Sequence, residues 1–205
     1  MRLLYVMDPM CAWCYGFRPE LENFLDKYPS AEVEWIMGGL APDSTQPMDD
    51  ELKQTIASYW YQIEQNTQVT FNHNYWQQNT PYRSTYSACR AVISAESLIE
   101  KSAQRMAKAI QSAYYQEAKN PSLEETLIDC ASSIGLDKNE FAEVFESEQT
   151  EHQLQRHLGI TRQFQIAGFP ALIYIDEANQ ASPLTLGFCK TADLEQRLNY
   201  IIEKH

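Results

Sequence analysis

The stretch LLYVMDPMCAWCYG, residues 3–16, decides how this chain is interpreted. It begins with an apolar run, Leu3–Met7, that predicts a buried strand, and it then carries two cysteines separated by two residues. If Cys11 caps a helix and Cys14 lies one turn further on, the two sulfurs come within bonding distance. The first sulfur then lies at the positive end of the helix, where a thiolate is favoured, and the second can resolve a mixed disulfide. The pattern therefore predicts a redox-active dithiol.

Two other interpretations of the pair stay open from spacing alone. The pair could be half of a zinc site, but Cys89, Cys130 and Cys189 are far apart, and no His stands at finger-like spacing from any of them. It could also be a pair of core cysteines, although Pro9 before it and the segment 16–19 after it indicate a chain reversal near the surface. We favour the redox interpretation and expect the three other cysteines to be buried small hydrophobes.

The composition limits the class of protein. A chain of 205 residues suits one large domain, or a small domain with an insertion, and 44% hydrophobic residues will build a core. No apolar run approaches the length of a membrane span, and a net charge of −12 disfavours nucleic acid as a partner. The start of the chain does not resemble a secretory signal, so we expect a cytoplasmic protein whose dithiol is usually reduced.

Hydrophobic periodicity predicts three parts. Strand, helix and strand are expected over residues 2–8, 14–28 and 32–37, which implies parallel strands joined by a right-handed crossover. Only helices and loops are expected from about 42 to 150, one of them opening with a capping box at Ser122. A helix to about 163, strands at 171–175 and 184–188, and a helix capped by Thr191 complete the chain.

A βαβ half followed by a ββα half makes a thioredoxin fold. We therefore predict an α/β protein in which residues 1–45 and 150–205 form a thioredoxin-like domain. Residues 46–149 are predicted to form an all-helical insertion domain between the two halves.

The residues around the dithiol carry a family resemblance. The segment 8–16, DPMCAWCYG, resembles the FrnE-like cytoplasmic branch of the DsbA-like thioredoxin-fold proteins. That family also includes 2-hydroxychromene-2-carboxylate isomerase and kappa-type glutathione transferases. Segments 83–86 and 113–115 are similar to its helical insertion, and Gly168-Phe169-Pro170 is similar to its Gly-x-Pro element. The resemblance implies a cis bond before Pro170, with Phe169 turned toward an extended substrate that pairs as an added strand.

The chain departs from the family pattern at two places. Ala12 and Trp13 stand between the cysteines where DsbA has Pro-His, so Cys11 lacks a polar partner there and depends on the helix terminus. Tyr5 stands where thioredoxin and DsbA carry a buried acid. The proton for the resolving thiol must then come from water or from another acid, for which Asp8 is a weak candidate.

The main functional hypothesis is a thiol–disulfide oxidoreductase or isomerase with Cys11 as the nucleophile and Cys14 as the resolving thiol. Trp13, Tyr15, Phe169 and Pro170 are expected to bind the substrate, and Tyr114 or Tyr115 to add apolar surface. The expected partners are a disulfide-containing protein or a small thiol and an unidentified recycling partner, with no metal, nucleic acid or membrane. No cofactor is expected except glutathione as a co-substrate.

Two alternatives belong to other functional classes. The first is a glutathione-dependent isomerase or transferase that acts on a small aromatic molecule. The isomerase and transferase branches generally have Ser in place of the first cysteine, whereas this chain has both cysteines. The second alternative is a non-catalytic module that binds a metal or a client protein. The direction of exchange depends on the reduction potential, which the sequence does not contain.

Overall fold

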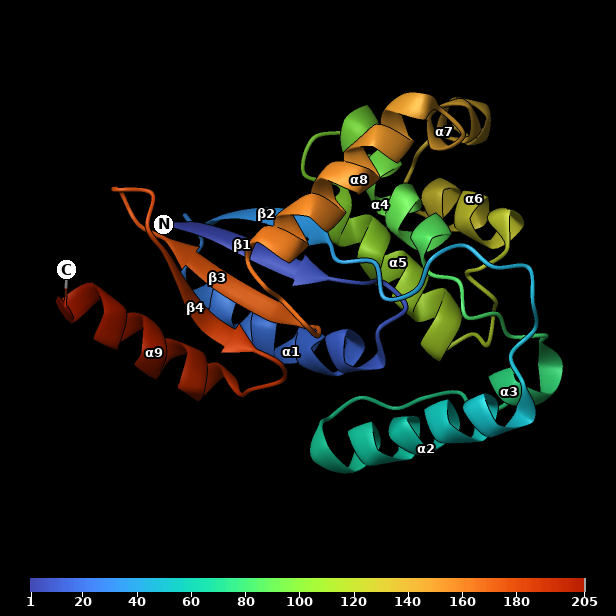
Figure 1. Cartoon of the computed structure of the whole chain (residues 1–205), viewed down its shortest axis with the longest axis horizontal. Helices are drawn as coiled ribbons and strands as arrows, with labels where there is room; N and C mark the ends of the chain where they lie inside the picture. The colour runs from blue at the N-terminus through green and yellow to red at the C-terminus, as the bar shows by residue number, and fades with distance from the viewer. Residues whose placement is uncertain (205) are drawn as a thin grey trace.

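A four-stranded mixed sheet forms the centre of the computed structural model, which describes residues 1–204 (Figure 1). Its strand order is β2-β1-β3-β4, with β1 parallel to β2, antiparallel to β3, and β3 antiparallel to β4. The strands are β1 Arg2–Met7, β2 Glu32–Met37, β3 Ala171–Ile175 and β4 Ala181–Leu186. This is the sheet of a thioredoxin fold, as the sequence predicts.

The sheet is covered on both faces, which explains why β1 is continuously apolar. Leu3, Tyr5 and Met7 belong to the main core, whereas Val6 packs with a smaller cluster on the opposite face. Helices α1 Ala12–Lys27 and α9 Thr191–Lys204 contact each other on the main-core face, and α8 Glu148–Gln163 covers the smaller cluster. The N-terminal helix α1 and the C-terminal helix α9, far apart in the chain, therefore pack into one core.

The middle of the chain is helical (Figure 1). In the described stretch of chain that runs from the end of β2 to the start of β3, the only β pairing is an isolated bridge between Pro47 and Tyr82. The helices are α2 Asp50–Asn66, α3 Tyr75–Gln78, α4 Tyr86–Leu98, α5 Ala103–Tyr115, α6 Glu124–Ser133 and α7 Lys138–Phe145. The domain boundaries at 45/46 and 149/150 stay a prediction, and α8 begins two residues before the second one.

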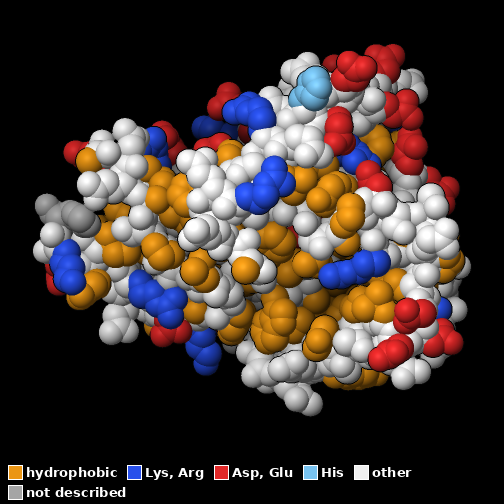
Figure 2. Space-filling model, viewed as in Figure 1, with side chains coloured by type: hydrophobic (Ala, Val, Ile, Leu, Met, Phe, Trp, Pro, Cys, Tyr) orange, Lys and Arg blue, Asp and Glu red, His pale blue; other side chains and the backbone are white. Residues whose placement is uncertain are grey.

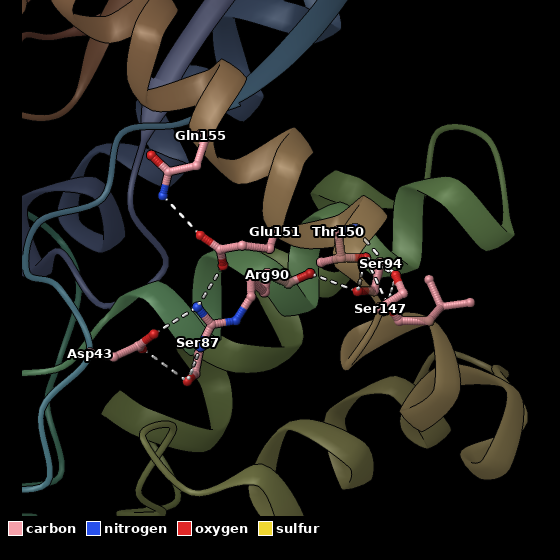
Figure 3. Close-up of polar contacts among 9 residues, drawn as sticks. Asp43, Ser87, Arg90, Ser94, Ser147, Thr150, Glu151 and Gln155 are labelled. Carbon is pink, nitrogen blue, oxygen red and sulfur yellow. Dashed lines mark hydrogen bonds and ion pairs between the residues drawn. The ribbon is translucent and has the colours of Figure 1, made fainter.

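Polar contacts join the helical middle to α8 (Figure 3). The Arg90 guanidinium of α4 lies 2.7 Å from a carboxylate oxygen of Asp43 and 3.3 Å from one of Glu151 on α8. One turn further along α4, the Ser94 hydroxyl lies 3.4 Å from the Thr150 hydroxyl, and both side chains are buried. Buried hydroxyls need such partners, so α4 and α8 hold a fixed relative position.

The predicted capping box at Ser122 does not form. Helix α6 begins at Glu124, with Leu123 at the capping position and no side-chain cap. The Ser122 hydroxyl instead donates to the Ser84 carbonyl oxygen at 2.9 Å. A distant main-chain acceptor therefore competes successfully with the local cap.

The last strand and helix also differ from the prediction. Strand β4 begins at Ala181 rather than Leu184, because Pro183 is tolerated on an edge strand. The strand ends at Leu186, whereas the sequence predicts it to continue to Phe188. Gly187, at a φ of +119°, turns the chain out of the extended conformation there. The Thr191 hydroxyl binds Glu20 of α1 instead of capping α9.

None of the described helices is long and apolar enough to cross a membrane. Acidic side chains gather along the edge formed by the insertion helices in the view of Figure 2, while apolar side chains form a band across the middle of the face.

Candidate active site: a dithiol at the start of α1

The two cysteines lie where β1 gives way to α1. Cys11 is the N-cap residue of α1, with extended dihedral angles (φ −81°, ψ 114°), and its N–H donates to the Asp8 carbonyl oxygen at 3.0 Å. Cys14 follows in the first turn. Both are free thiols, with 6% of Cys11 and none of Cys14 exposed. The sequence-predicted arrangement is therefore present, with Cys11 slightly exposed and Cys14 fully enclosed.

Burial governs the protonation of the inner sulfur, Cys14. Burial raises the pKa of Cys14 well above its ordinary value, and a hydrogen bond and the charge of Cys11 raise it further. Cys14 therefore remains a thiol while the pair is reduced, because burial makes a negative charge on its sulfur unfavourable.

The structure brings the predicted proline element to the dithiol. The Cys11 thiol donates to the Phe169 carbonyl oxygen at a sulfur–oxygen distance of 3.7 Å, and the peptide bond between Phe169 and Pro170 is cis. The Phe169 ring lies so close to Gly38 that a Cβ at position 38 would be 2.1 Å from a ring carbon. Glycine at the end of β2 is therefore what lets the Phe169 loop approach Cys11.

The other two predicted substrate residues occupy different environments. Trp13 is half-buried, and its ring centre lies 5.8 Å from that of Phe188 in the loop after β4. Tyr15 is only 1% exposed, and its hydroxyl donates to the Thr70 carbonyl oxygen at 3.1 Å. Its ring stacks on Tyr115 at 4.6 Å, so Tyr15 packs the insertion against α1 and has no free surface for a substrate.

Tyr114 and Tyr115, which were expected to add apolar surface at the site, are also buried. Their rings pack against Tyr75, Trp60 and Phe71 inside the insertion. The aromatic residues of this region therefore build an interior rather than an open floor.

Asp8 is the polar centre of the site, although it is fully buried. Its carboxylate accepts from the N–H groups of Met10 (2.8 Å) and Leu40 (2.7 Å) and from the hydroxyl of Thr85 (2.6 Å). The Cys89 thiol adds a fourth contact at 3.5 Å. Burial raises the pKa of Asp8, and these hydrogen bonds oppose that rise. The carboxylate ties the cysteine turn to the loop after β2 and to the start of α4.

The sequence suggests Asp8 only as a proton donor and does not reveal this structural role. The available signal was an acid placed directly after a buried strand and before Pro9. Its partners, Leu40 and Thr85, carried no signal of their own, because they are 32 and 77 residues away.

A small cavity lies behind Cys14. Its volume is about 10 Å³, near the space that one water molecule needs, and Tyr5, Cys14, Arg18 and Gln111 are among its lining residues. The Tyr5 hydroxyl is buried and lacks a hydrogen bond of normal geometry among the described residues. Burial and then the charge of Cys14 raise the pKa of Tyr5 well above its ordinary value. A neutral phenol therefore stands where related folds carry an acid.

The remaining cysteines are buried, as predicted. Burial raises the pKa of the Cys130 thiol to about 11 and also raises that of Cys189. Within residues 1–204, no three His, Cys, Asp or Glu side chains gather in a way that could hold a metal ion.

A family model described as thioredoxin matches residues 4–196, nearly the whole chain. The chain belongs to the thioredoxin family. Among solved structures, this thioredoxin-family chain is similar to a candidate protein disulfide isomerase from Nitrosomonas europaea, at 26% identity and a TM-score of 0.89. The match covers 100% of this chain and 98% of the other.

A second similar structure is the cytosolic disulfide reductase DsbM from Pseudomonas aeruginosa, at 24% identity and a TM-score of 0.81. Both chains are covered completely, and another structure of that protein is with GSH, at a TM-score of 0.79. These likenesses confirm the resemblance to the DsbA-like thioredoxin-fold proteins.

A curated relative is the ClpXP adapter protein SpxH from Bacillus subtilis, which is 22% identical over 181 residues. The match covers 88% of this chain but only 60% of SpxH. The chain thus spans about three fifths of the length of that relative.

Proposed function

We propose that this protein is a cytoplasmic thiol–disulfide oxidoreductase that uses Cys11 and Cys14. The observation that carries the proposal is the unequal placement of the two sulfurs at the start of α1. Cys11 keeps a slight exposure, 6%, and lies against the Phe169 carbonyl group, whereas Cys14 is fully enclosed. This is the arrangement that a two-step exchange needs, because one sulfur must meet the substrate and the other must resolve the product.

The reaction begins with the Cys11 thiolate attacking one sulfur of the substrate disulfide. That disulfide bond breaks, and the leaving sulfur takes a proton from water. Cys14 then loses its proton and attacks the Cys11 sulfur, which releases the second substrate thiol and leaves a Cys11–Cys14 disulfide. Small thiols restore the dithiol by the reverse exchange. The nucleophile, Cys11, and the resolving thiol, Cys14, both belong to the chain, so no resident cofactor is required.

The substrate class that we propose is a disulfide in a protein or in a small thiol, with glutathione as a co-substrate. The exposed main chain beside Phe169 suits an extended peptide, and Trp13 offers a half-buried apolar ring nearby. The similarity to a cytosolic disulfide reductase, for which a structure with GSH exists, supports the cytoplasmic setting and the co-substrate. The reduction potential, measured in a glutathione redox buffer, decides between oxidation and reduction.

The decisive experiment compares two single variants on a protein disulfide. Cys14→Ser should accumulate a mixed disulfide through Cys11, because the resolving thiol is missing, and Cys11→Ser should lose exchange and form no adduct. Mass spectrometry after an acid quench detects the adduct. Cys189→Ser is the control, since that thiol is buried beside α9 and should leave exchange unchanged. Loss of activity in both variants with no trapped adduct would contradict the mechanism.

The same variants separate the alternative, a glutathione-dependent isomerase or transferase acting on a small aromatic substrate. Such a reaction needs one activated group and no resolving thiol. Glutathione-dependent turnover that survives in Cys14→Ser would favour this alternative over disulfide exchange.

A further inference from the structure

The free edge of the sheet lies at β2, on the other side of the strand from β1. In a parallel ladder, each residue directs its N–H and C=O to the same side, and neighbouring residues alternate. The Glu32 and Gly38 amides donate to carbonyl groups of the β1 segment, so the even-numbered residues face β1. The main-chain groups of Val33, Trp35 and Met37 therefore point out of the sheet.

Of the three outward N–H groups, only that of Met37 finds an acceptor among the described residues. The Met37 N–H donates to the ring nitrogen Nδ1 of His157 on α8, at 3.1 Å. Val33 and Trp35 form no outward main-chain hydrogen bond with any described residue. Helix α8 thus covers the β2 edge at the C-terminal end of the strand, at Met37. About two residues of the edge, Val33 and Trp35, stay open, and such an unpaired edge can template another strand.

A groove runs along this open edge. Its volume is about 1240 Å³, above the usual range for small-molecule pockets, which suits a peptide segment. Val33 and Trp35 form one side, with Ile93 and Ser97 of α4 and Gln153 of α8 among the residues of the other walls. The groove also contacts the last turn of α1 at Leu25 and Tyr28, whereas the dithiol lies at the first turn. The two sites are therefore separated by the length of α1, about 24 Å for its 16 residues.

The charge of the groove indicates the chemistry of its occupant. Glu32, Glu34 and Glu143 line it, are exposed, and have no ion-pair partner among the described residues. Of the basic residues there, Arg2 is engaged with Asp176 and Asn179, and Lys101 lies 4.0 Å from Glu100. A second copy of this chain is disfavoured by its own net charge of −12.

We propose that the β2 groove binds an extended, lysine- or arginine-containing segment of a partner protein as an added strand. The outward groups of Val33 and Trp35 pair with the main chain of the segment, and its basic side chains meet Glu32, Glu34 and Glu143. This site is independent of the dithiol chemistry and of the proposed function.

The test uses a capped synthetic peptide, Lys-Val-Lys-Val-Lys-Val, and amide hydrogen exchange of the full-length protein measured by NMR. Exchange of the Val33 and Trp35 amides should slow by about tenfold or more at saturating peptide, while the Glu34 amide, already bonded to β1, should not change. The same peptide with Glu in place of Lys should bind at least about tenfold more weakly, and binding of the lysine peptide should weaken with salt. Equal binding of both peptides, or no slowing at Val33 and Trp35, overturns the proposal.

A matched pair of variants tests the added strand. Val33→Pro removes an outward N–H and leaves the ladder to β1 intact, so it should abolish peptide binding, whereas Val33→Ala keeps the N–H and should bind within about threefold. If Val33→Pro does not fold, a peptide N-methylated at alternate amides makes the same test on the unchanged protein. Binding that survives both changes overturns the proposal. Sedimentation of the protein without peptide tests the other occupant. A dimer that is lost in Val33→Pro would show that the groove binds a second copy of this chain and would overturn the proposal of a partner segment.

Discussion

Asp8 shows how a single buried carboxylate can organise the turn that carries the dithiol. Its four contacts come from its own turn, from the loop after β2 and from the start of α4. A buried charge is unfavourable unless it is well hydrogen-bonded, and each N–H or hydroxyl that it satisfies would be unfavourable if left alone. Asp8 therefore positions the Cys11 turn without touching a substrate.

Asp8→Asn tests this role. The amide nitrogen would replace an oxygen that now accepts from the Leu40 N–H and the Thr85 hydroxyl, so at least one donor would lose its acceptor. We expect the free energy of unfolding to fall by about 1–3 kcal/mol in urea titrations. Asp129→Asn, on the exposed face of α6, is the control and should change stability by less than about 0.5 kcal/mol. An unchanged midpoint in Asp8→Asn would show that the network contributes little.

At the scale of elements, α8 joins the two halves of the molecule. It contacts α4 through Arg90, Ser94 and their partners (Figure 3). It also covers one face of the sheet and accepts the outward Met37 N–H through His157. Burial, and then the charge of Arg156, lower the pKa of His157 to about 4. The ring is therefore neutral in the folded protein, as an acceptor at Nδ1 requires.

Stability should consequently depend on pH through His157. In the unfolded chain a histidine gains a proton near pH 6.5, whereas the folded ring stays neutral until about pH 4. The unfolded state therefore binds more protons in this interval, and stability falls as the pH drops from 6.5 to 4, by no more than about 3 kcal/mol. Above pH 6.5 the histidine contributes no slope.

The measurement compares urea midpoints of the wild type and His157→Gln between about pH 4 and 7. The glutamine oxygen can still accept the Met37 N–H but does not titrate, so the variant should lose this part of the pH dependence. Asp8, whose pKa is raised, contributes with the opposite sign in both proteins and cancels in the comparison. Parallel curves for the two proteins would contradict the assignment.

At the scale of the whole molecule, the net charge of −12 should influence which small disulfides react fastest. Acidic side chains line the insertion edge in Figure 2. A negative protein attracts cations and repels anions over distances set by the Debye length, about 30 Å at 0.01 M salt and 3 Å at 1 M.

We therefore expect cystamine, a cationic disulfide, to react faster with the reduced protein than glutathione disulfide, which is anionic. The ratio of the two rates should fall by about threefold to tenfold between 0.01 M and 1 M salt. Stopped-flow tryptophan fluorescence follows both reactions, and the neutral hydroxyethyl disulfide is the control, with a rate that should not change with salt. A ratio independent of salt would show that Cys11 does not experience the overall charge.

The sequence by itself determined the features that depend on neighbours in the chain. The apolar run before Cys11, the two-residue spacing to Cys14, and the periodicity of the later segments were sufficient for the βαβ and ββα halves and the helical middle. These signals are local, because strand alternation and helical turns repeat within a few residues. The resemblance to a family then indicated that Phe169 and Pro170 belong to the same site.

Tertiary structure decided what depends on distant contacts. It placed the Phe169 carbonyl against Cys11 across 158 residues, surrounded Asp8 with donors from three elements, and buried Tyr15 in the interface with the insertion. It also left the edge of β2 open at Val33 and Trp35. No periodicity records such contacts, because they depend on which surfaces meet once the chain has packed, and packing is set by the whole core.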